Sequence, residues 1–525
     1  MNLVINFFVI INCLIFCVQS FKILIFYPIP SLSLSLLGET QSRLLSNAGH
    51  EVTYITNYPL KNKPERNYRE IYTAQVLEVY SLNAATVLNV KYIMEHGMFN
   101  EDPLFFQQFA LNMARIALQN ENVTNLLKDT KEEFDVVIVD FYETEVYAGL
   151  STVFNCPMIW YYGMSPNWNV MRLVDDYWNP AYTVNYLSVN VPPLNFYQRT
   201  LELWTLIKWI YYKTFVTLPL EQSFFVEYFR PLAKLRGQSL PAYREVTYNA
   251  SIVFCNDYNV GGNLPALPQN FKMIGGLHFQ SHNEPLPMDL QTLMDESKQG
   301  VIYLSFGSAW QSKDIPEPIK TDLLKMFGKL NQTVIWKYES DDLKNVPENV
   351  HIKQWVPQPS LLAHKNFLIF ITHGGQMSST EAVKIGVPLI GVPIMFDQLV
   401  NIKKAVSLGY ALDVKLDYDL VKNLEIAIKV MLEDPKYRQR AKELSWVYND
   451  RPVAPGAELV HWVQHVVRTR GAAHLRSPAL TTPLFQKMYL DLAAVIFVVI
   501  IIFVIIAKRF TSFVCSKRTN LKKIQ

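Results

Sequence analysis

Short apolar segments alternate with helix-like stretches along this chain, and the alternation occurs twice, before and after a loop rich in glycine and proline. The apolar segments before the loop lie at 21–28, 51–56, 134–140, 157–163 and 251–256, and those after it lie at 301–308, 333–338, 351–356, 367–375 and 388–393. Nearly continuous apolar strands that are separated by helices predict parallel sheets covered on both faces.

The repetition predicts an α/β protein with two doubly wound domains in tandem. We expect an N-terminal domain over 21–260, a linker over 261–280 and a C-terminal domain over 281–487. Parallel sheets of this kind bind ligands outside the carboxyl ends of their strands. The ligand site is therefore expected in a cleft between the two domains.

Apolar runs at both ends of the chain indicate that the protein is targeted to a membrane. The run within residues 1–20 predicts a secretory signal peptide, although no Lys or Arg precedes it, so an uncleaved anchor is the alternative. The second run predicts a transmembrane helix over 488–508, followed by a basic cytosolic tail over 509–525. Because basic residues favour the cytosolic side, we expect a single-pass type I protein with lumenal domains.

Short motifs are consistent with this topology. The chain ends in Lys522-Lys523-Ile524-Gln525, which is similar to the dilysine signal that retrieves type I membrane proteins to the endoplasmic reticulum. Three Asn-x-Ser/Thr sequons agree with a lumenal location but are short enough to arise by chance. They begin at Asn122, Asn249 and Asn331.

Composition excludes several classes of protein. The 525 residues carry 49 Lys and Arg against 46 Asp and Glu, so no overall basic field indicates a nucleic-acid partner. A hydrophobic fraction of 50% excludes a disordered chain. Five cysteines are too few for a disulfide scaffold, and no cluster of His, Asp, Glu or Cys predicts a metal site.

One stretch in the first half, residues 195–216, is amphipathic and rich in aromatic residues. A core or lid helix is one interpretation of this pattern. The alternative is a helix that lies on a membrane surface.

The most informative segment surrounds His373. An apolar strand runs into His373 and two glycines, and a helix follows. Glycines at such a turn let backbone N–H groups approach an anion, and the helix N-terminus favours negative charge. Ser378 and Glu381 share one face of the helix. A diphosphate would suit His373 and Ser378, and Glu381 could accept hydrogen bonds from ribose hydroxyls, whereas a plain βα turn is the alternative for this segment alone.

Several motifs together resemble the donor-binding signature of the UDP-glycosyltransferases, in particular the UDP-glucuronosyltransferase-like family-1 glycosyltransferases in their insect-like form. The matching motifs are W-x-P-Q at Trp355–Gln358, H-x-G-x-x-S-x-x-E at His373–Glu381, D-Q at Asp397-Gln398, IGGLHF at 274–279, FGS at 306–308, Arg451-Pro452 and GAAHLRSP at 471–478. The resemblance implies a GT-B fold, which consists of two Rossmann-like doubly wound domains with a cleft between them. It also implies a UDP-sugar co-substrate, with no metal and no cofactor.

The roles of individual residues follow from the resemblance. Trp355 would stack on the uracil, although an ordinary core aromatic is the alternative, and Gln358 would contact the base and the ribose. Asp397 and Gln398 would hydrogen-bond the sugar, although Asp397 could instead simply cap the following helix. The other implied donor residues are Ser308, His373, Gly375 and Ser378 at the phosphates and Glu381 at the ribose.

The chain departs from the family at the catalytic base. Inverting sugar transfer uses a base to activate the acceptor, and in the family this base is a histidine that an aspartate orients. The aspartate is matched by Asp140, but the histidine position is occupied by Leu34. His50 follows the first helix, at the end of the βαβ unit away from the strand tips, so it is not expected to substitute.

Two functions remain. The first is a membrane-bound transferase that moves glucose or glucuronic acid from UDP-glucose or UDP-glucuronate to small lipophilic acceptors with inversion. It would favour amines, act slowly, or use Asp140 directly or through a water. The second is a UDP-sugar-binding pseudoenzyme that acts as a partner or regulator of active relatives. Both functions involve a lipid bilayer, and both are compatible with a homo-oligomer or a hetero-oligomer.

Overall fold

The computed structural model describes residues 20–521, apart from 61–62, 65, 79–89, 97–101, 176–178, 263–266 and 281–283. The predicted signal peptide, except for Ser20, and the dilysine-like end lie outside the described residues. The chain separates into two units, Met1–Arg476 and Ser477–Gln525.

The N-terminal half of the larger unit is built on a parallel sheet of seven strands in the order β3-β2-β1-β4-β5-β6-β7. The strands are β1 (Lys22–Phe26), β2 (Glu51–Thr56), β3 (Tyr68–Tyr72), β4 (Val136–Asp140), β5 (Met158–Tyr162), β6 (Ile252–Cys255) and β7 (Phe271–Met273). The register places Ile23 beside both Val52 and Val136, so the first strand is central and the chain winds outward in both directions.

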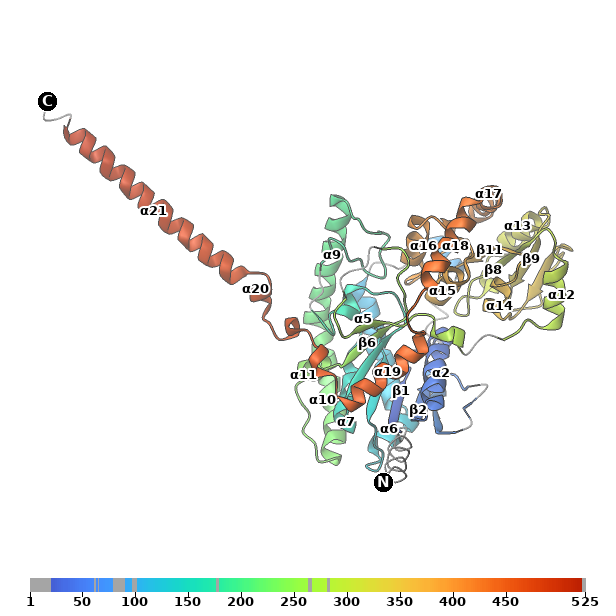
Figure 1. Cartoon of the computed structure of the whole chain (residues 1–525), viewed down its shortest axis with the longest axis horizontal. Coiled ribbons are helices and arrows are strands. Elements are labelled where there is room, and N and C mark those ends of the chain that lie inside the picture. Colours follow the sequence, from blue (N-terminus) through green and yellow to red (C-terminus); the bar gives the residue numbers. More distant parts are fainter. Residues whose placement is uncertain are drawn as a thin grey trace, which may run out of the picture. The chain divides into compact units, whose positions relative to one another are not determined.

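The C-terminal half is built on a second parallel sheet of six strands in the order β10-β9-β8-β11-β12-β13. The strands are β8 (Val301–Ser305), β9 (Thr333–Lys337), β10 (Val350–Lys353), β11 (Phe367–Thr372), β12 (Leu389–Gly391) and β13 (Ala411–Asp413). The strand order repeats the doubly wound pattern of the first sheet (Figure 1). Both sheets confirm the prediction of two Rossmann-like layers in tandem.

Helices cover both faces of each sheet, as parallel strands require. In the first half they are α2 (Leu32–Asn47), α4 (Val90–His96), α5 (Pro103–Gln119), α6 (Glu121–Lys128), η1 (Val146–Ala148), α7 (Gly149–Phe154), α8 (Trp168–Met171), α9 (Phe196–Tyr212), the π-helical η2 (Lys213–Thr217), α10 (Leu218–Leu235), α11 (Tyr243–Thr247) and η3 (Leu277–Gln280). In the second half they are α12 (Met288–Glu296), η4 (Ser312–Asp314), α13 (Glu317–Phe327), α14 (Gln358–Leu362), α15 (Gln376–Ile385), α16 (Gln398–Ser407), α17 (Leu420–Glu433), α18 (Lys436–Asn449), α19 (Pro455–Arg468) and η5 (Ala473–Leu475).

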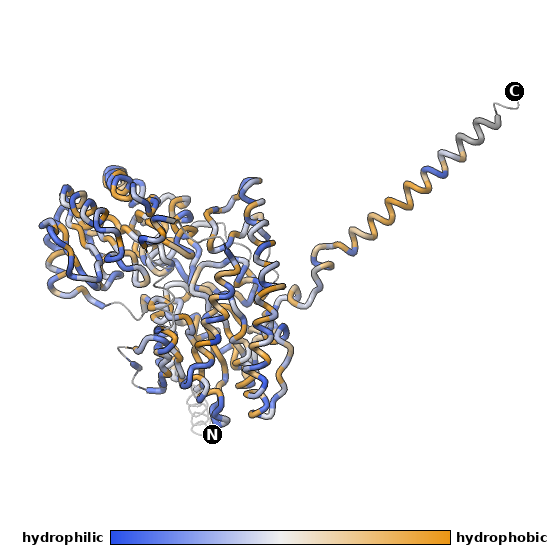
Figure 2. Tube along the Cα trace, turned by 180° about the vertical axis from the view of Figure 1, so that it is seen from behind, coloured by the Kyte–Doolittle hydropathy of each residue, from blue (hydrophilic) through white to orange (hydrophobic). Residues whose placement is uncertain are grey.

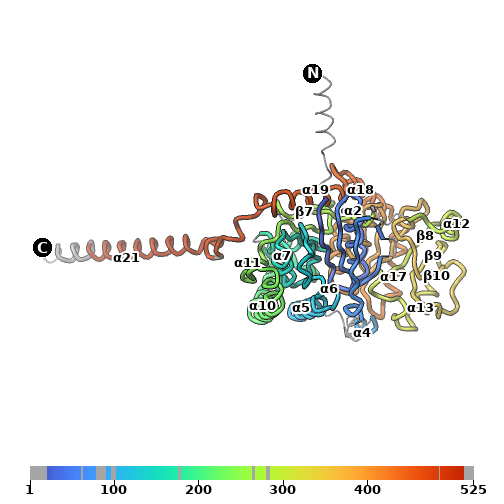
Figure 3. The backbone as a smooth tube through the Cα atoms, turned by 90° about the horizontal axis from the view of Figure 1, so that it is seen from below, coloured from blue at the N-terminus to red at the C-terminus, as the bar shows by residue number. Residues whose placement is uncertain are grey.

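Alternation along β4 decides which core each side chain enters. Val137 and Val139 pack with residues of α5, α7 and α10, whereas Val136 and Ile138 pack with residues of α2 and α19. Figure 3 shows α2 and α19 on one side of the N-terminal half and α5 and α10 on the opposite side. The last residue of the strand, Asp140, continues the second series and therefore belongs to the α2 face.

The helix α19 follows the second sheet in sequence but packs against the first. Its side chains Leu459, Val463 and Val466 are fully buried in the same core as Leu37 of α2. The chain therefore crosses back to the N-terminal sheet before it leaves the unit. The domain boundaries predicted from the sequence stay a prediction.

The aromatic stretch at 195–216 forms α9 and η2, with apolar side chains on two sides. Leu206 and Trp209 are buried and pack with Trp168 of α8. The opposite side exposes Trp204 by 58% and Tyr211 by 56%. The helix is therefore a core element on one side only, and the membrane-surface interpretation of its other side stays a prediction.

The smaller unit contains η6 (Pro478–Leu480), α20 (Leu484–Lys487) and the long helix α21 (Leu490–Leu521). The segment Leu490–Phe513 is long and apolar enough to cross a bilayer. Figure 2 shows an apolar run along most of the helix and a hydrophilic stretch beyond it. A C-terminal apolar helix is thus present where the sequence predicts a transmembrane segment, and it begins at Leu490.

Candidate active site

His373 lies at the turn where β11 meets α15. Gly374 has a φ of +84° and Gly307, after β8, has a φ of +81°, both in the left-handed region that favours glycine. A Cβ atom on Gly307 would lie 2.6 Å from the ring of His373, so only glycine lets the two turns approach so closely. Burial, together with the charge of Lys337, lowers the pKa of His373 to about 4. This histidine is therefore a neutral hydrogen-bonding group near pH 7.

The residues around this turn differ in accessibility. Gly375 is the N-cap of α15, and Ser378 is buried in the first turn of that helix. Ser308, in the loop after β8, is exposed beyond Gly307. The backbone N–H groups at the start of α15 have no partners within the helix, and such groups suit an anion.

A buried lysine also lies next to the turn after β8, and the sequence analysis did not predict it. Lys337 ends β9 and is 7% exposed. Its Nζ donates to the carbonyl oxygen of Gly307 at 2.7 Å and lies 3.1 Å from Oε1 of Glu339. The signal in the sequence is a lysine at the carboxyl end of an otherwise apolar strand.

The predicted base and ribose residues lie together at the start of α14 and on α15. Nε2 of Gln358 donates to Oε2 of Glu381 at 2.6 Å and to Oγ of Ser378 at 3.1 Å. Trp355, just before α14, exposes 60% of its surface, so it is not a core aromatic. An exposed indole offers a flat surface on which a base can stack.

A second residue that the sequence reasoning missed also contacts Glu381. His278 belongs to η3, between the two sheets, and only 1% of it is exposed. Its Nε2 lies 3.2 Å from Oε1 of Glu381. The motif IGGLHF contains this histidine, but nothing in the motif indicates its partner.

Asp397 stands at the N-cap position of α16, but its side chain makes no capping hydrogen bond. Oδ2 of Asp397 accepts from Nδ2 of Asn401 at 2.7 Å, and the same amide donates to the carbonyl oxygen of Gly374 at 3.1 Å. Burial raises the pKa of Asp397 to about 6. The oxygen Oε1 of Gln398 accepts from the backbone N–H groups of Ile394 and Met395. Both side chains are thereby fixed beside the His373 turn.

Leu34 and Asp140 meet in the N-terminal half. Leu34 lies in the first turn of α2, and Asp140 ends β4. A Cβ atom on Gly163, after β5, would lie 2.5 Å from Cδ2 of Leu34 and 4.0 Å from Oδ1 of Asp140. Leu34 and Asp140 therefore both lie beside Gly163, and an aliphatic side chain is close to the carboxyl group.

Asp140 is buried in the N-terminal half. It is 1% exposed, and neither of its carboxyl oxygens has a hydrogen-bond partner among the described residues. Burial raises the pKa of Asp140 well above its ordinary range. The carboxyl group consequently stays protonated to a higher pH. A protonated carboxyl group cannot take a proton from the substrate that receives the sugar.

His50 lies away from this pair. Its ring stacks on Phe21, its Nδ1 accepts from the backbone N–H of Phe21 at 3.3 Å, and its Nε2 lies 3.1 Å from Nε2 of Gln464 on α19. Burial and the charge of Arg468 lower the pKa of His50. His50 thus ties the start of β1 to α19.

Gln376, the first residue of α15, connects the two halves of the unit. Its Oε1 accepts from Oγ of Ser165, after β5, at 3.1 Å, and its Nε2 donates to the carbonyl oxygen of Asn256, after β6, at 3.0 Å. The carboxyl ends of the N-terminal strands therefore meet the start of α15, the helix that follows the His373 turn. This is the arrangement expected for a ligand site between two doubly wound sheets.

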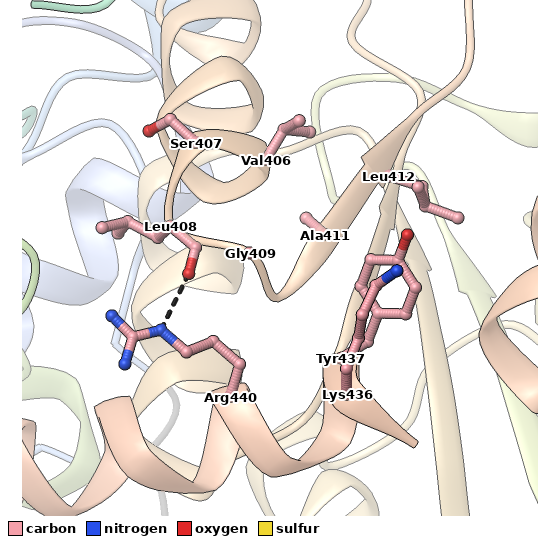
Figure 4. A pocket seen from close by; sticks show the side chains of 9 residues that line it. All are labelled: Val406, Ser407, Leu408, Gly409, Ala411, Leu412, Lys436, Tyr437 and Arg440. Carbon is pink, nitrogen blue, oxygen red and sulfur yellow. Dashed lines mark hydrogen bonds between the residues drawn. The ribbon is translucent and has the colours of Figure 1, made fainter. Parts of the chain in front are cut away.

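A surface pocket of about 470 Å³ lies elsewhere in the C-terminal half. It is lined by Val406, Ser407, Leu408, Gly409, Ala411, Leu412, Lys436, Tyr437 and Arg440 (Figure 4). Nε of Arg440 donates to the carbonyl oxygen of Leu408 at 2.9 Å. None of the residues predicted to bind the UDP-sugar lines this pocket.

Within the described ranges, no group of three or more His, Cys, Asp or Glu is placed to hold a metal ion.

Solved structures of glycosyltransferases resemble the chain in fold. The glycotransferase of kitacinnamycin aligns with a TM-score of 0.53 and 16% identity over 86% of this chain and 100% of its own. The calicheamicin glycosyltransferase CalG4 aligns with a TM-score of 0.51 and 16% identity over 86% of this chain and 99% of its own. The two Rossmann-like sheets are thus a GT-B fold, as the sequence predicts.

Sequence comparison identifies the family to which the chain belongs. The model of the family described as UDP-glucoronosyl and UDP-glucosyl transferase matches residues 36–525. UDP-glucosyltransferase 2 of Dactylopius coccus is 30% identical over 93% of this chain and 92% of its own length. UDP-glucuronosyltransferase 2B1 of Rattus norvegicus is 32% identical over 49% of this chain and 48% of its own. The chain belongs to the UDP-glycosyltransferase family, whose enzymes transfer glucose or glucuronic acid from a UDP-sugar.

Proposed function

We propose that this protein is a membrane-bound UDP-glycosyltransferase that transfers the sugar with inversion to small lipophilic acceptors and favours amines over hydroxyl compounds. The observation that carries the proposal is the pair Leu34 and Asp140, in which a buried carboxyl group faces a leucine instead of a basic ring. A hydroxyl acceptor has to lose its proton as it attacks, and nothing at this position is suited to take it.

An amine acceptor avoids this difficulty. Its neutral nitrogen carries a lone pair that can attack the anomeric carbon directly, so the bond from nitrogen to carbon forms while the bond from carbon to the UDP oxygen breaks. UDP leaves with the electron pair, and the nitrogen becomes positively charged. A primary or secondary amine then releases its extra proton to solvent, so no basic side chain has to remove a proton during the attack.

The donor side supports ordinary UDP-sugar binding. We assign Trp355 to the uracil, with Gln358 at the base and the ribose. Glu381 would bind the ribose hydroxyls, and Asp397 and Gln398 the sugar. The phosphate groups would lie against Ser308, His373, Gly375 and Ser378, with the nearby charge of Lys337. These assignments are supported by the grouping of most of these side chains at the turn between β11 and α15 and on the adjoining helices α14 and α16.

The bilayer is part of the proposal. The apolar segment Leu490–Phe513 would anchor the protein in the membrane of the endoplasmic reticulum, with the basic tail in the cytosol and both halves of the larger unit in the lumen.

One experiment separates this proposal from a pseudoenzyme. The full-length protein in nanodiscs is tested for UDP binding by calorimetry and for transfer from UDP-glucose and UDP-glucuronate to matched phenols and aromatic or tertiary amines. We expect UDP binding together with amine products that exceed phenol products. UDP binding without any turnover would favour the pseudoenzyme instead.

A further inference from the structure

Glu381 is held from two sides by elements that are far apart in the sequence. Its carboxylate is 5% exposed, Gln358 of α14 donates to Oε2, and His278 of η3 approaches Oε1. A carboxylate oxygen can accept two hydrogen bonds, so each oxygen keeps one free acceptor position. Two such positions on a fixed plane match two neighbouring hydroxyl groups of a ribose.

We infer that His278 is a positioning residue of the donor site, and that its imidazole sets the orientation in which Glu381 accepts the ribose hydroxyls of the UDP-sugar. This inference rests on the proposed role of Glu381. The contact joins Nε2 and Oε1 at 3.2 Å without the alignment of a good hydrogen bond. Hydrogen bonds in active sites are often poorly aligned before the substrate is bound.

A purely structural role explains the position of His278 less well. The neighbouring side chains Ile274 and Leu277 are fully buried in the core shared with α2 and α19, so they already fix this segment. Nδ1 of His278 has no hydrogen-bond partner among the described residues. The imidazole is therefore buried beside the carboxylate of Glu381 without a hydrogen-bond partner among the described residues, and an apolar side chain would serve packing alone.

The chain offers a matched control. Nε2 of His364 lies 3.3 Å from Oδ1 of Asp295, which is a second contact between a histidine and a carboxylate, at a place outside the predicted donor residues. Substitution of His364 tests what the loss of such a pair does to the fold alone.

The test compares UDP with 2′,3′-dideoxy-UDP, which lacks the ribose hydroxyls, by calorimetry on the full-length protein. Hydrogen bonds to a charged acceptor predict that wild type prefers UDP by about tenfold or more. His278→Leu is expected to lose most of this preference while its affinity for the dideoxy compound is unchanged. His278→Gln should retain part of the preference because its amide can donate, and His364→Leu should retain all of it.

Two results would overturn the inference. One is that His278→Leu keeps the full preference, and the other is that it weakens both ligands equally, which would indicate a general structural role. Melting temperatures identify variants that fail to fold, and His278→Gln then decides the question. If wild type binds UDP and the dideoxy compound equally, the proposed role of Glu381 fails first and this inference fails with it.

Discussion

At the scale of single residues, Leu34 faces the buried carboxyl group of Asp140 where a histidine would carry a proton. A histidine introduced there would gain a carboxylate partner, because an imidazolium favours the ionised form of Asp140. We therefore expect Leu34→His to raise transfer from radiolabelled UDP-glucose to a phenol by about 10²-fold or more, the usual contribution of general-base catalysis. Transfer to an aromatic amine should change far less.

The double variant Leu34→His with Asp140→Asn is the control, since it removes the partner that orients the ring. It should lose most of the gain in phenol transfer. An unchanged rate with phenol in Leu34→His would mean that Leu34 does not occupy the position of the family's base.

Asp397 gives a prediction on pH. Its pKa is raised to about 6 by burial, so the carboxyl group is protonated below that pH and ionised above it. If the carboxylate accepts hydrogen bonds from the sugar, the KM for the UDP-sugar should rise as the pH falls through about 6, whereas the KM of Asp397→Asn should not change with pH in this way. His373 stays neutral over this range because its pKa is about 4. The same rise of the KM in Asp397→Asn would contradict the assignment to the sugar.

At the scale of elements, a buried ionic cluster secures the helix α9 and the turn η2. Lys213 lies 2.7 Å from Oε2 of Glu145 and 2.8 Å from Oε2 of Glu221, and Arg172 pairs with Glu145 from the other side. Burial opposes the ionisation of Glu145, but Arg172 and Lys213 outweigh it and lower the pKa of Glu145 to about 2. Glu145 is therefore charged at neutral pH, whereas burial raises the pKa of Glu221 on the other side of Lys213.

Removal of one cation should destabilise the fold strongly. We expect Lys213→Met to lower the free energy of unfolding by about 3–5 kcal/mol, because two buried carboxylates lose a partner. Chemical denaturation of the full-length protein in detergent measures this change. The half-exposed Lys403, which pairs with Asp413, is the control, and Lys403→Met should cost no more than about 1 kcal/mol. Equal effects of the two variants would contradict the account.

The sequence predicts elements better than contacts between elements. Apolar strands and the glycine turn at His373 are local patterns, so both sheets and the start of α15 could be predicted. The pair of His278 and Glu381 depends on how η3 folds back onto α15, and no local pattern records that. The exposed side of α9 is a similar case, since an amphipathic pattern does not say which apolar side faces the core.

At the scale of the whole molecule, the fold does not determine on which side of a membrane the two sheets lie. Basic residues after the apolar segment of α21 predict a cytosolic tail, and hence lumenal sheets. The sequons offer an independent test, because Asn122, Asn249 and Asn331 are all exposed and N-glycans are added only in the lumen.

We expect the full chain, expressed in insect or mammalian cells, to carry glycans that endoglycosidase H removes. Asn331→Gln should abolish one step of the mass shift, and Thr333→Ser, which preserves that sequon, should not. Replacement of Lys522 and Lys523 by serine should let the protein leave the endoplasmic reticulum and render its glycans resistant, because the dilysine-like end would be lost. A chain that shows no shift at any of the three sites, yet stays in the membrane after alkaline extraction, would place both sheets in the cytosol. The phenol and amine acceptors would then have to be sought on that side.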